Sequence, residues 1–184
     1  KPGYGLWLHG RGKTLLPRDT QGCVAMQTKE LRELEQHFKL SQTPVLIGTT
    51  SSSQGDGQRL DKSARELKTR LQTWVRAWEQ RSDHFFSLYH KNKFSRSDSQ
   101  SFRTFQSRKE DLFRLYSWID IYLDHLQIIP GPGYWVTSFG QYFRSPCFQS
   151  QGVKRLYWQK TEQGEWKIIG REWVPLNLEL EEAY

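Results

Sequence analysis

The sequence predicts an α+β fold, because two segments with helical hydrophobic spacing are followed by several that alternate as strands do. Aromatic residues make up 14% of the 184 residues, which suits strands and a lined cavity better than a plain helical bundle. A small, polar, Gly/Ser-rich stretch interrupts the chain near residue 50 and has nothing to bury. We therefore expect a first part at 1–48, a linker at 49–60 and a larger domain at 61–184.

The larger domain opens with two predicted helices. Ser63 and Glu66 stand at the spacing of a capping box, which predicts a helix start. The apolar residues that follow at helical spacing on one face are Leu60, Ala64, Leu67, Leu71, Trp74, Val75 and Trp78. A second helix is predicted from about Ser99 to Tyr116, with Phe102, Phe105, Leu112 and Leu115 on its apolar side.

Strands are predicted for the rest of this domain. Alternation begins near Ile119, and residues 130–133 (Pro-Gly-Pro-Gly) form a turn before a strand at 134–137. Residues 153–159 and 165–173 flank a polar turn at 161–164, the pattern of a hairpin. Two helices followed by an antiparallel sheet complete the α+β prediction.

The first part offers less material for a core. It contains a short apolar run ending at His9, a polar loop up to Val24, a helix from Thr28 and a strand at 44–47. Two strands and one helix bury too little apolar surface to fold alone.

Charge and composition exclude several classes. The net charge is +7, and residues 58–116 hold 14 of the 27 basic side chains. These bases alternate with acids and form no run, so we expect a solvated helical face or contact with an anionic envelope polymer, and no nucleic-acid partner. No segment approaches the roughly 18 apolar residues of a membrane span, so no transmembrane segment is expected.

His9 and Cys23 are the residues that suggest chemistry. A thiol is a nucleophile as the thiolate, which needs a nearby base or imidazolium to lower its pKa. Gly22 allows a sharp backbone turn, so the amides around Cys23 could point at an oxygen beside the sulfur. Taken alone, one Cys and one His on a loop are weak evidence, and a buried cysteine with a surface histidine is the commoner case.

The surrounding order of residues resembles the C-terminal half of L,D-transpeptidase (YkuD-type) catalytic domains. The match covers about residues 4–48 and rests on His9-Gly10, then Thr20-x-Gly22-Cys23 and the closing Thr-Pro-Val segment at 43–47. The resemblance implies that Cys23 is the nucleophile, His9 the general base and Gly22 the residue that shapes the oxyanion hole. It also implies substrate contacts at Gly10, Thr20 and Gln21.

Such a catalytic domain has an N-terminal half of β-strands, so residues 1–48 are expected to be only its mostly-β C-terminal part, inactive on their own. Gln21 and Ala25 differ from the residues that many members carry, which leaves substrate choice and the exact reaction open. The larger domain resembles the nuclear transport factor two-like (NTF2-like) fold over about 62–174, chiefly at 71–79, 139–145, 152–158 and 164–173. That resemblance implies a curved sheet wrapped around helices to form a cone with an aromatic-lined opening.

Other candidates carry less weight. Cys147 follows Pro146 in a predicted loop, where a passive thiol is the expected reading. His84, His90 and His125 lack the partners of a zinc site. Asp120 and Asp124 are either acid/base residues in the cone or solvated strand residues. Four tryptophans either stack on sugar rings or pack in the core: Trp135, Trp158, Trp166 and Trp173.

The expected function is that of a bacterial cysteine L,D-transpeptidase acting on peptidoglycan stem peptides, with an appended binding domain. An L,D-carboxypeptidase or amidase on the same substrate, or a non-catalytic envelope binding module, stays open as an alternative. No cofactor or metal is expected. The expected partners are stem peptides and an envelope protein or lipoprotein. The expected location is the periplasm or envelope of a Gram-negative bacterium.

Overall fold

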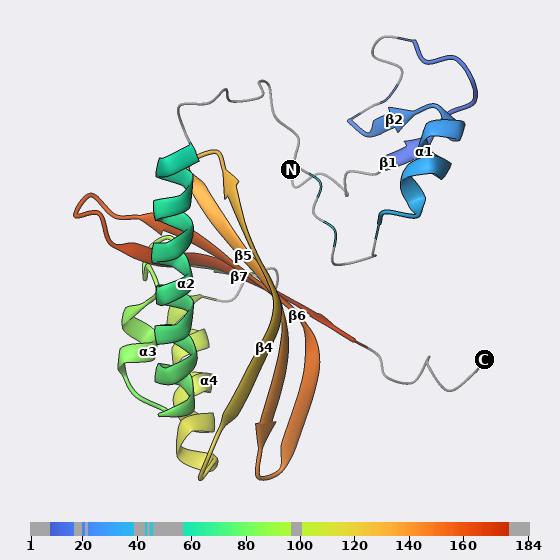
Figure 1. Cartoon of the computed structure of the whole chain (residues 1–184). Helices are drawn as coiled ribbons and strands as arrows, with labels where there is room; N and C mark the ends of the chain where they lie inside the picture. Colours follow the sequence, from blue (N-terminus) through green and yellow to red (C-terminus); the bar gives the residue numbers. More distant parts are fainter. Residues whose placement is uncertain are drawn as a thin grey trace. The chain divides into compact units, whose positions relative to one another are not determined.

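The computed structural model describes residues 8–16, 20, 22–38, 43, 45, 57–96 and 101–176. The chain forms two compact units, Lys1–Gly48 and Thr49–Tyr184, which are considered separately below (Figure 1).

The described residues of the first unit form two short strands and a helix. Strands β1 (Leu8–Gly10) and β2 (Val24–Met26) pair in parallel, and helix α1 (Thr28–Glu35) follows β2 directly. The backbone N–H of Gln27 donates to the Glu30 carboxylate at 3.3 Å, which helps to start α1 where the sequence predicted it. Strand β2 was not predicted, because three residues are too few to display an alternation. The strand predicted at 44–47 lies outside the described residues, apart from Val45.

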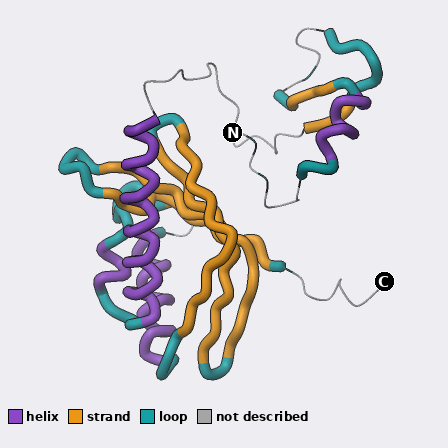
Figure 2. Tube along the Cα trace, in the orientation of Figure 1, coloured by secondary structure: helices purple, strands orange, loops and turns teal. Residues whose placement is uncertain are grey.

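In the second unit, residues 57–96 and 101–176 form three helices and a five-stranded sheet (Figure 2). The helices are α2 (Gly57–Glu79), α3 (His84–Ser87) and α4 (Phe102–Leu115). The strands are β3 (Ser95–Arg96), β4 (Asp120–Gly131), β5 (Tyr134–Ser145), β6 (Phe148–Lys160) and β7 (Trp166–Pro175).

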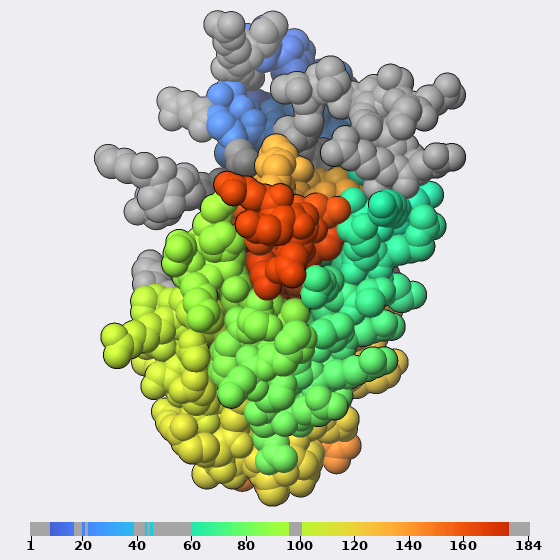
Figure 3. Space-filling view, turned by 90° about the vertical axis from the view of Figure 1, so that its left-hand side faces the viewer, coloured from blue at the N-terminus to red at the C-terminus, as the bar shows by residue number. Residues whose placement is uncertain are grey.

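The sheet has the order β3-β7-β6-β5-β4. The four long strands are joined as consecutive antiparallel hairpins, and β3 adds in parallel beside β7. The sheet curves, and the three helices lie on its concave face (Figure 1). On the helical side, α2, α3 and α4 lie beside one another, with the end of the β6–β7 hairpin (red) reaching the surface between α2 and the α3 region (Figure 3). This is the predicted α+β architecture with a curved, mainly antiparallel sheet.

The core of the second unit fills the space between helices and sheet with aromatic rings. From α2, Trp74 is 1% exposed, and its ring lies 4.9 Å from Trp78 and 6.2 Å from Phe139 on β5. The tryptophan N–H groups have partners: Trp74 Nε1 donates to the Tyr89 hydroxyl and Trp158 Nε1 to the Thr137 hydroxyl, both at 2.9 Å. Satisfied polar atoms allow such large rings to be buried without an unpaired donor.

The helix prediction was right about the buried face and wrong about the start. Leu67, Leu71, Trp74 and Trp78 are buried as the spacing indicated. However, α2 begins at Gly57, within the stretch 49–60 predicted as a linker, so Ser63 and Glu66 lie inside the helix and are not a capping box. Glu66 instead contacts strand residues far away in the sequence, which the local pattern could not indicate.

Helix α4 also differs from its prediction at its ends. It begins at Phe102, and the Ser101 hydroxyl caps it by accepting from the Thr104 N–H at 3.2 Å. Phe102 and Phe105 are buried as predicted, but Leu115 at the last turn is 68% exposed. The short helix α3 was not predicted, because four residues give no periodicity to detect.

Candidate functional site

The parallel pairing in the first unit relates His9 to Cys23. His9 lies opposite Ala25, and side chains two residues apart on an extended strand point to the same face. Cys23 immediately precedes β2 and is two residues from Ala25, so an extended backbone at Cys23 would turn its side chain toward the His9 side of the ladder. The register therefore brings the strand that holds His9 beside the strand that follows Cys23, although 14 residues separate the two in the sequence (23 − 9 = 14).

The backbone before Cys23 is turned as the sequence predicted. Gly22 has a φ of +101°, a conformation that L side chains rarely adopt, and a Cβ there would meet nothing within 4 Å. Glycine is thus required by conformation and not by crowding. The Thr20 hydroxyl donates to the Cys23 carbonyl at 2.6 Å and holds the turn in place.

His9 and Cys23 do not form a hydrogen-bonded pair. Both His9 and Cys23 are half-buried, and within the described residues they share no hydrogen bond. His9 Nδ1 lies 3.5 Å from the Gly10 carbonyl oxygen, at the upper limit for a hydrogen bond. Hydrogen bonds between catalytic residues are often long in the absence of substrate. The lack of a hydrogen bond between His9 and Cys23 is therefore compatible with a histidine that acts as base for the thiol.

The predicted substrate-contact residues are placed differently. A Cβ at Gly10 would lie 3.0 Å from the Thr28 hydroxyl and 3.1 Å from its Cα, so this glycine lets β1 approach the start of α1. Thr20 is engaged with Cys23 as described above. Gln21 lies outside the described residues.

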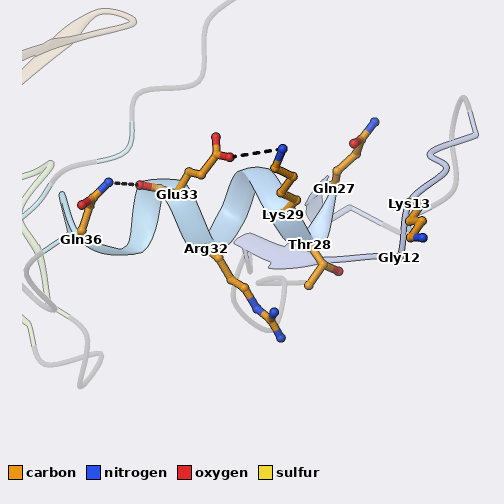
Figure 4. Close-up of a pocket in the computed structure, with 8 residues that line it drawn as sticks. All are labelled: Gly12, Lys13, Gln27, Thr28, Lys29, Arg32, Glu33 and Gln36. Carbon is orange, nitrogen blue, oxygen red and sulfur yellow. Dashed lines mark hydrogen bonds and ion pairs between the residues drawn. The ribbon is translucent and has the colours of Figure 1, made fainter.

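A hollow of about 780 Å³ lies beside α1 in the first unit (Figure 4). Figure 4 shows the Lys29 ammonium facing the Glu33 carboxylate along one side of the helix, while Arg32 points away from them. Neither His9 nor Cys23 lines it. The lining residues are Gly12, Lys13, Gln27, Thr28, Lys29, Arg32, Glu33 and Gln36. Exposed charged side chains of this kind fit a solvated surface better than an active site.

The interior of the second unit is packed and not open. Trp158 is fully buried and Trp166 is 5% exposed, so core packing, and not stacking on a ligand, is the role of these two rings. Of the two readings left open for the four strand tryptophans, core packing therefore holds for Trp158 and Trp166. Trp135 and Trp173 are half-buried, and they keep part of their surface available.

Two polar side chains stand among these rings. Lys154 on β6 is 4% exposed, and its Nζ lies 4.7 Å from the centre of the Trp78 ring, 5.0 Å from Trp173 and 5.5 Å from Trp74. Lys154 pairs with Phe139 in the β5–β6 register, and Gln141, two residues along the same face, is 2% exposed. The Gln141 Oε1 is buried with no hydrogen-bond partner in the described part of the chain.

Buried polar groups cost free energy unless a partner compensates them, so they mark candidate sites. The cation is held against aromatic faces, which favour a positive charge. Sequence reasoning missed both residues, although the signal was available. They occupy the same alternating positions as Phe139 and Leu156, so they are polar residues on an apolar face.

Asp124 and His125 lie outside this interior. Asp124 pairs with Gly140, whose neighbour Phe139 points to the core, so Asp124 lies on the outer face of the sheet. His125, at a bulge with a φ of +46°, has its Nδ1 3.3 Å from the Asp124 carboxylate. Burial and the neighbouring Asp124 carboxylate raise the pKa of Tyr142. Of the two readings left open for Asp124, its place on the outer face of the sheet excludes an acid/base role inside the cone and favours a solvated strand residue.

In the described ranges, no three His, Cys, Asp or Glu side chains gather where they could share a metal ion. None of the helices described here has the length and hydrophobicity that crossing a bilayer requires.

Solved structures similar to this chain share its fold. The structure of Bd1075 from Bdellovibrio bacteriovorus is 26% identical with a TM-score of 0.74, and the match covers 96% of this chain and 63% of that one. A mutant of the helical cell shape determining protein Pgp2 from Campylobacter jejuni is 24% identical with a TM-score of 0.69, covering 92% and 60%. This chain thus spans about three fifths of the length of these proteins.

The second unit alone has further counterparts. An NTF2-like superfamily protein from Salmonella enterica matches with a TM-score of 0.56 at 13% identity, covering 67% of this chain and 99% of that protein. No curated protein matches the chain. The family described as the Cds6 C-terminal NTF2-like domain matches residues 66–172, which is more than half of the chain. The chain belongs to this family of NTF2-like domains.

Proposed function

We propose that the protein is a cysteine L,D-transpeptidase of the bacterial envelope that acts on peptidoglycan stem peptides, with the NTF2-like domain as its binding domain. The observation that carries the proposal is the β1–β2 register, which pairs His9 with Ala25, two residues after Cys23 and three after the left-handed Gly22. A cell-shape role of the similar protein Pgp2 supports an envelope substrate. Because the chain spans about three fifths of that protein, the activity is proposed for the intact protein.

The proposed reaction has two acyl transfers. His9 takes the proton from the Cys23 thiol, and the sulfur attacks the carbonyl carbon of the third stem residue. Backbone N–H groups at the Gly22–Cys23 turn stabilise the oxyanion of the tetrahedral intermediate. The C–N bond to the terminal D-alanine breaks, the alanine amine leaves with the proton, and a thioester remains on Cys23.

An amine from a second stem or an anchored envelope protein then attacks the thioester. The new amide forms, the C–S bond breaks and the proton lost by the amine returns to the thiol. With water as the acceptor, the same site acts as an L,D-carboxypeptidase. No step needs a metal or organic cofactor.

The test is release of D-alanine from tetrapeptide muropeptides by the intact protein. Cys23→Ala should abolish the release, and His9→Ala should slow it by about 100-fold, the usual loss for a missing general base. Cys147→Ala is the matched control, because this cysteine is exposed on the β5–β6 turn and should leave the rate unchanged. Full activity of Cys23→Ala would refute the proposal.

Thiol reactivity gives an independent measurement. Cys23 is half-buried and Cys147 exposed, so accessibility alone would make Cys147 react faster with iodoacetamide at neutral pH. Faster labelling of Cys23, slowed in His9→Ala, would indicate activation by the imidazole. Faster labelling of Cys147 that is indifferent to His9 would contradict it.

A non-catalytic envelope binding module is the second candidate, and the observation that favours it is the buried Lys154 among tryptophan rings. Binding of Cys23→Ala protein to isolated sacculi, lost in Lys154→Met, would support a binding role separate from catalysis. Retained binding by Lys154→Met would exclude Lys154 as the anchor.

A further inference from the structure

A second hollow lies at one end of the second unit, and Lys154 does not line it. Its volume is about 480 Å³, within the range of small-molecule sites. It lies where the first turns of α2, the β4–β5 turn and the end of the β6–β7 hairpin meet. The lining residues are Leu60, Ser63, Pro130, Gly131, Gly133, Tyr134, Trp135, Gln159, Lys160 and Trp166.

The wall of this hollow is aromatic. The rings of Trp135 and Trp166 meet edge to face, with centroids 6.2 Å apart. Trp166 is 5% exposed and acts as the fixed back wall, whereas Trp135 is half-buried and keeps part of its surface open. Tyr134 stands at the rim, and the absence of a side chain at Gly131 makes room for its ring, since a Cβ there would lie 2.9 Å from it.

The two charges at the hollow neutralise each other. Glu66 accepts from Trp166 Nε1 at 2.8 Å and lies 3.0 Å from Lys160 Nζ. Lys160 also lies over the Trp166 ring, 4.9 Å from its centre. The Trp166 N–H and then the Lys160 ammonium lower the pKa of Glu66, so the carboxylate stays ionised at neutral pH. An anionic ligand would have to compete with Glu66 for the ammonium.

Uncharged polar groups remain available around the aromatic wall. In the described part of the chain, the hydroxyls of Ser63 and Tyr134 and the indole N–H of Trp135 have no hydrogen-bond partner. Gln159, by contrast, is fixed, because its Nε2 donates to the Gly133 carbonyl at 3.1 Å and its Oε1 accepts from Lys93 at 2.9 Å. The hollow thus combines a flat apolar surface, free neutral donors and no net charge.

We propose that this hollow is a binding site for an uncharged pyranose sugar ring of an oligosaccharide. A sugar ring has one apolar face of C–H groups, which can lie on an indole, and a rim of hydroxyls that pair with neutral donors and acceptors. The Lys160 ammonium is already paired with Glu66, so an anionic ligand would find no unpaired cation here. An aliphatic ligand would leave the three neutral donors without a hydrogen-bond partner. The proposal does not depend on the thiol chemistry of Cys23.

Titration of the full chain with chitotetraose and, separately, cellotetraose tests it. Both are neutral pyranose chains, and only the first carries N-acetyl groups, so the pair separates ring stacking from amide recognition. Binding is followed by the indole N–H resonances in NMR and by calorimetry. We expect the Trp135 indole resonance to shift on addition of at least one of them, and no Trp135 shift with either sugar would overturn the proposal.

Trp135→Ala should weaken the binding by about ten-fold or more, the usual cost of a lost stacking ring. Trp118→Ala is the matched control, because Trp118 is 44% exposed and does not line the hollow. If Trp135→Ala fails to fold, as judged by its melting curve, Trp135→Phe retains a ring and Ser63→Ala removes one donor, and each should weaken binding by a smaller factor. Equal affinity of all these variants would refute the site.

Salt dependence distinguishes a neutral ligand from an anionic one. A neutral sugar should bind with nearly the same affinity at low salt and at about 0.5 M salt, because no charge pair is formed. Affinity that falls steeply with salt would indicate recognition through the Lys160 charge and would overturn the assignment of a neutral ligand.

Discussion

The two units of this chain differ in how much side-chain surface they bury. In the second unit, α2, α3, α4 and the sheet enclose a continuous cluster of buried aromatic and aliphatic side chains. In the first unit, every described residue is at least partly exposed, and α1 has no buried side chain. The residues proposed for catalysis thus lie in the unit with little core, while folding stability is concentrated in the unit with the proposed binding sites. The proposed catalytic residues and most of the buried core thus lie in different parts of the sequence.

The largest expected effect tests where the stability resides. Trp74→Ala removes a ring that is 1% exposed and contacts Trp78, Phe85 and Phe139, and we expect it to destabilise the protein by about 3–5 kcal/mol. Leu31→Ala in α1 is the matched change, because Leu31 is half-buried. We expect it to leave the main denaturant-unfolding transition unchanged.

Circular dichroism and tryptophan fluorescence would follow both variants. A main transition that shifts as much for Leu31→Ala as for Trp74→Ala would break the comparison, because it would mean that the two units unfold as one cooperative structure.

The sequence indicated the larger unit well because its elements are long. Alternation and turn residues located β5, β6 and β7, and helical spacing identified the buried face of α2. What was missed depends on contacts between distant residues. Glu66 was read as a local cap because its partners, Trp166 and Lys160, are about a hundred positions away.

The candidate site shows the same limit. The identities of His9, Gly22 and Cys23 could be singled out from the sequence, and the turn at Gly22 was predicted correctly. The parallel pairing that sets His9 opposite Ala25, two residues after Cys23, could not be predicted, because β1 and β2 have three residues each and no detectable period. The aromatic hollow at Trp135 required the meeting of three segments from different parts of the chain.

A glycine pair in the sheet tests the packing of the second unit at an intermediate magnitude. A Cβ at Gly152 would overlap the Val174 carbonyl oxygen and lie 2.8 Å from the Trp173 ring, so Gly152→Ala should destabilise by about 1–3 kcal/mol. A Cβ at Gly170 would make ordinary contacts of 3.4–3.5 Å, so Gly170→Ala should change stability by less than about 0.5 kcal/mol. Denaturant unfolding measures both, and equal effects would contradict the close approach at Gly152.

A smaller effect concerns the ion pair at the hollow. The Trp166 N–H and Lys160 lower the pKa of Glu66 from its ordinary value of 4.5, so the folded state holds the ionised form more tightly than the unfolded state does. This contribution is complete above pH 4.5 and is lost as the pH falls through the lowered pKa of the folded protein. Because both side chains are partly exposed, we expect at most about 1 kcal/mol.

Melting temperatures recorded between about pH 5 and pH 3 measure it. The decline should be shallower in Glu66→Gln than in the unmodified protein. Glu162→Gln removes an exposed carboxylate from the neighbouring β6–β7 turn and is the control for the change in net charge. Parallel curves for the unmodified protein and Glu66→Gln would show that the folded state does not favour ionised Glu66.

The smallest expected effect lies in the first unit. Lys29 and Glu33 form an i,i+4 pair at 3.9 Å, but their side chains are 88% and 65% exposed, and the lysine precedes the glutamate, the weaker of the two orders. Glu33→Ala should therefore change stability by less than about 0.5 kcal/mol, and the main melting transition should not move, because α1 buries no side chain that this pair could hold in place. The same measurement at about 0.5 M salt should give the same result, since an exposed pair is already screened. A clear drop in the main transition would mean that α1 is packed more firmly than its exposure indicates, and the contrast between a sparsely packed first unit and a densely packed second one would have to be abandoned.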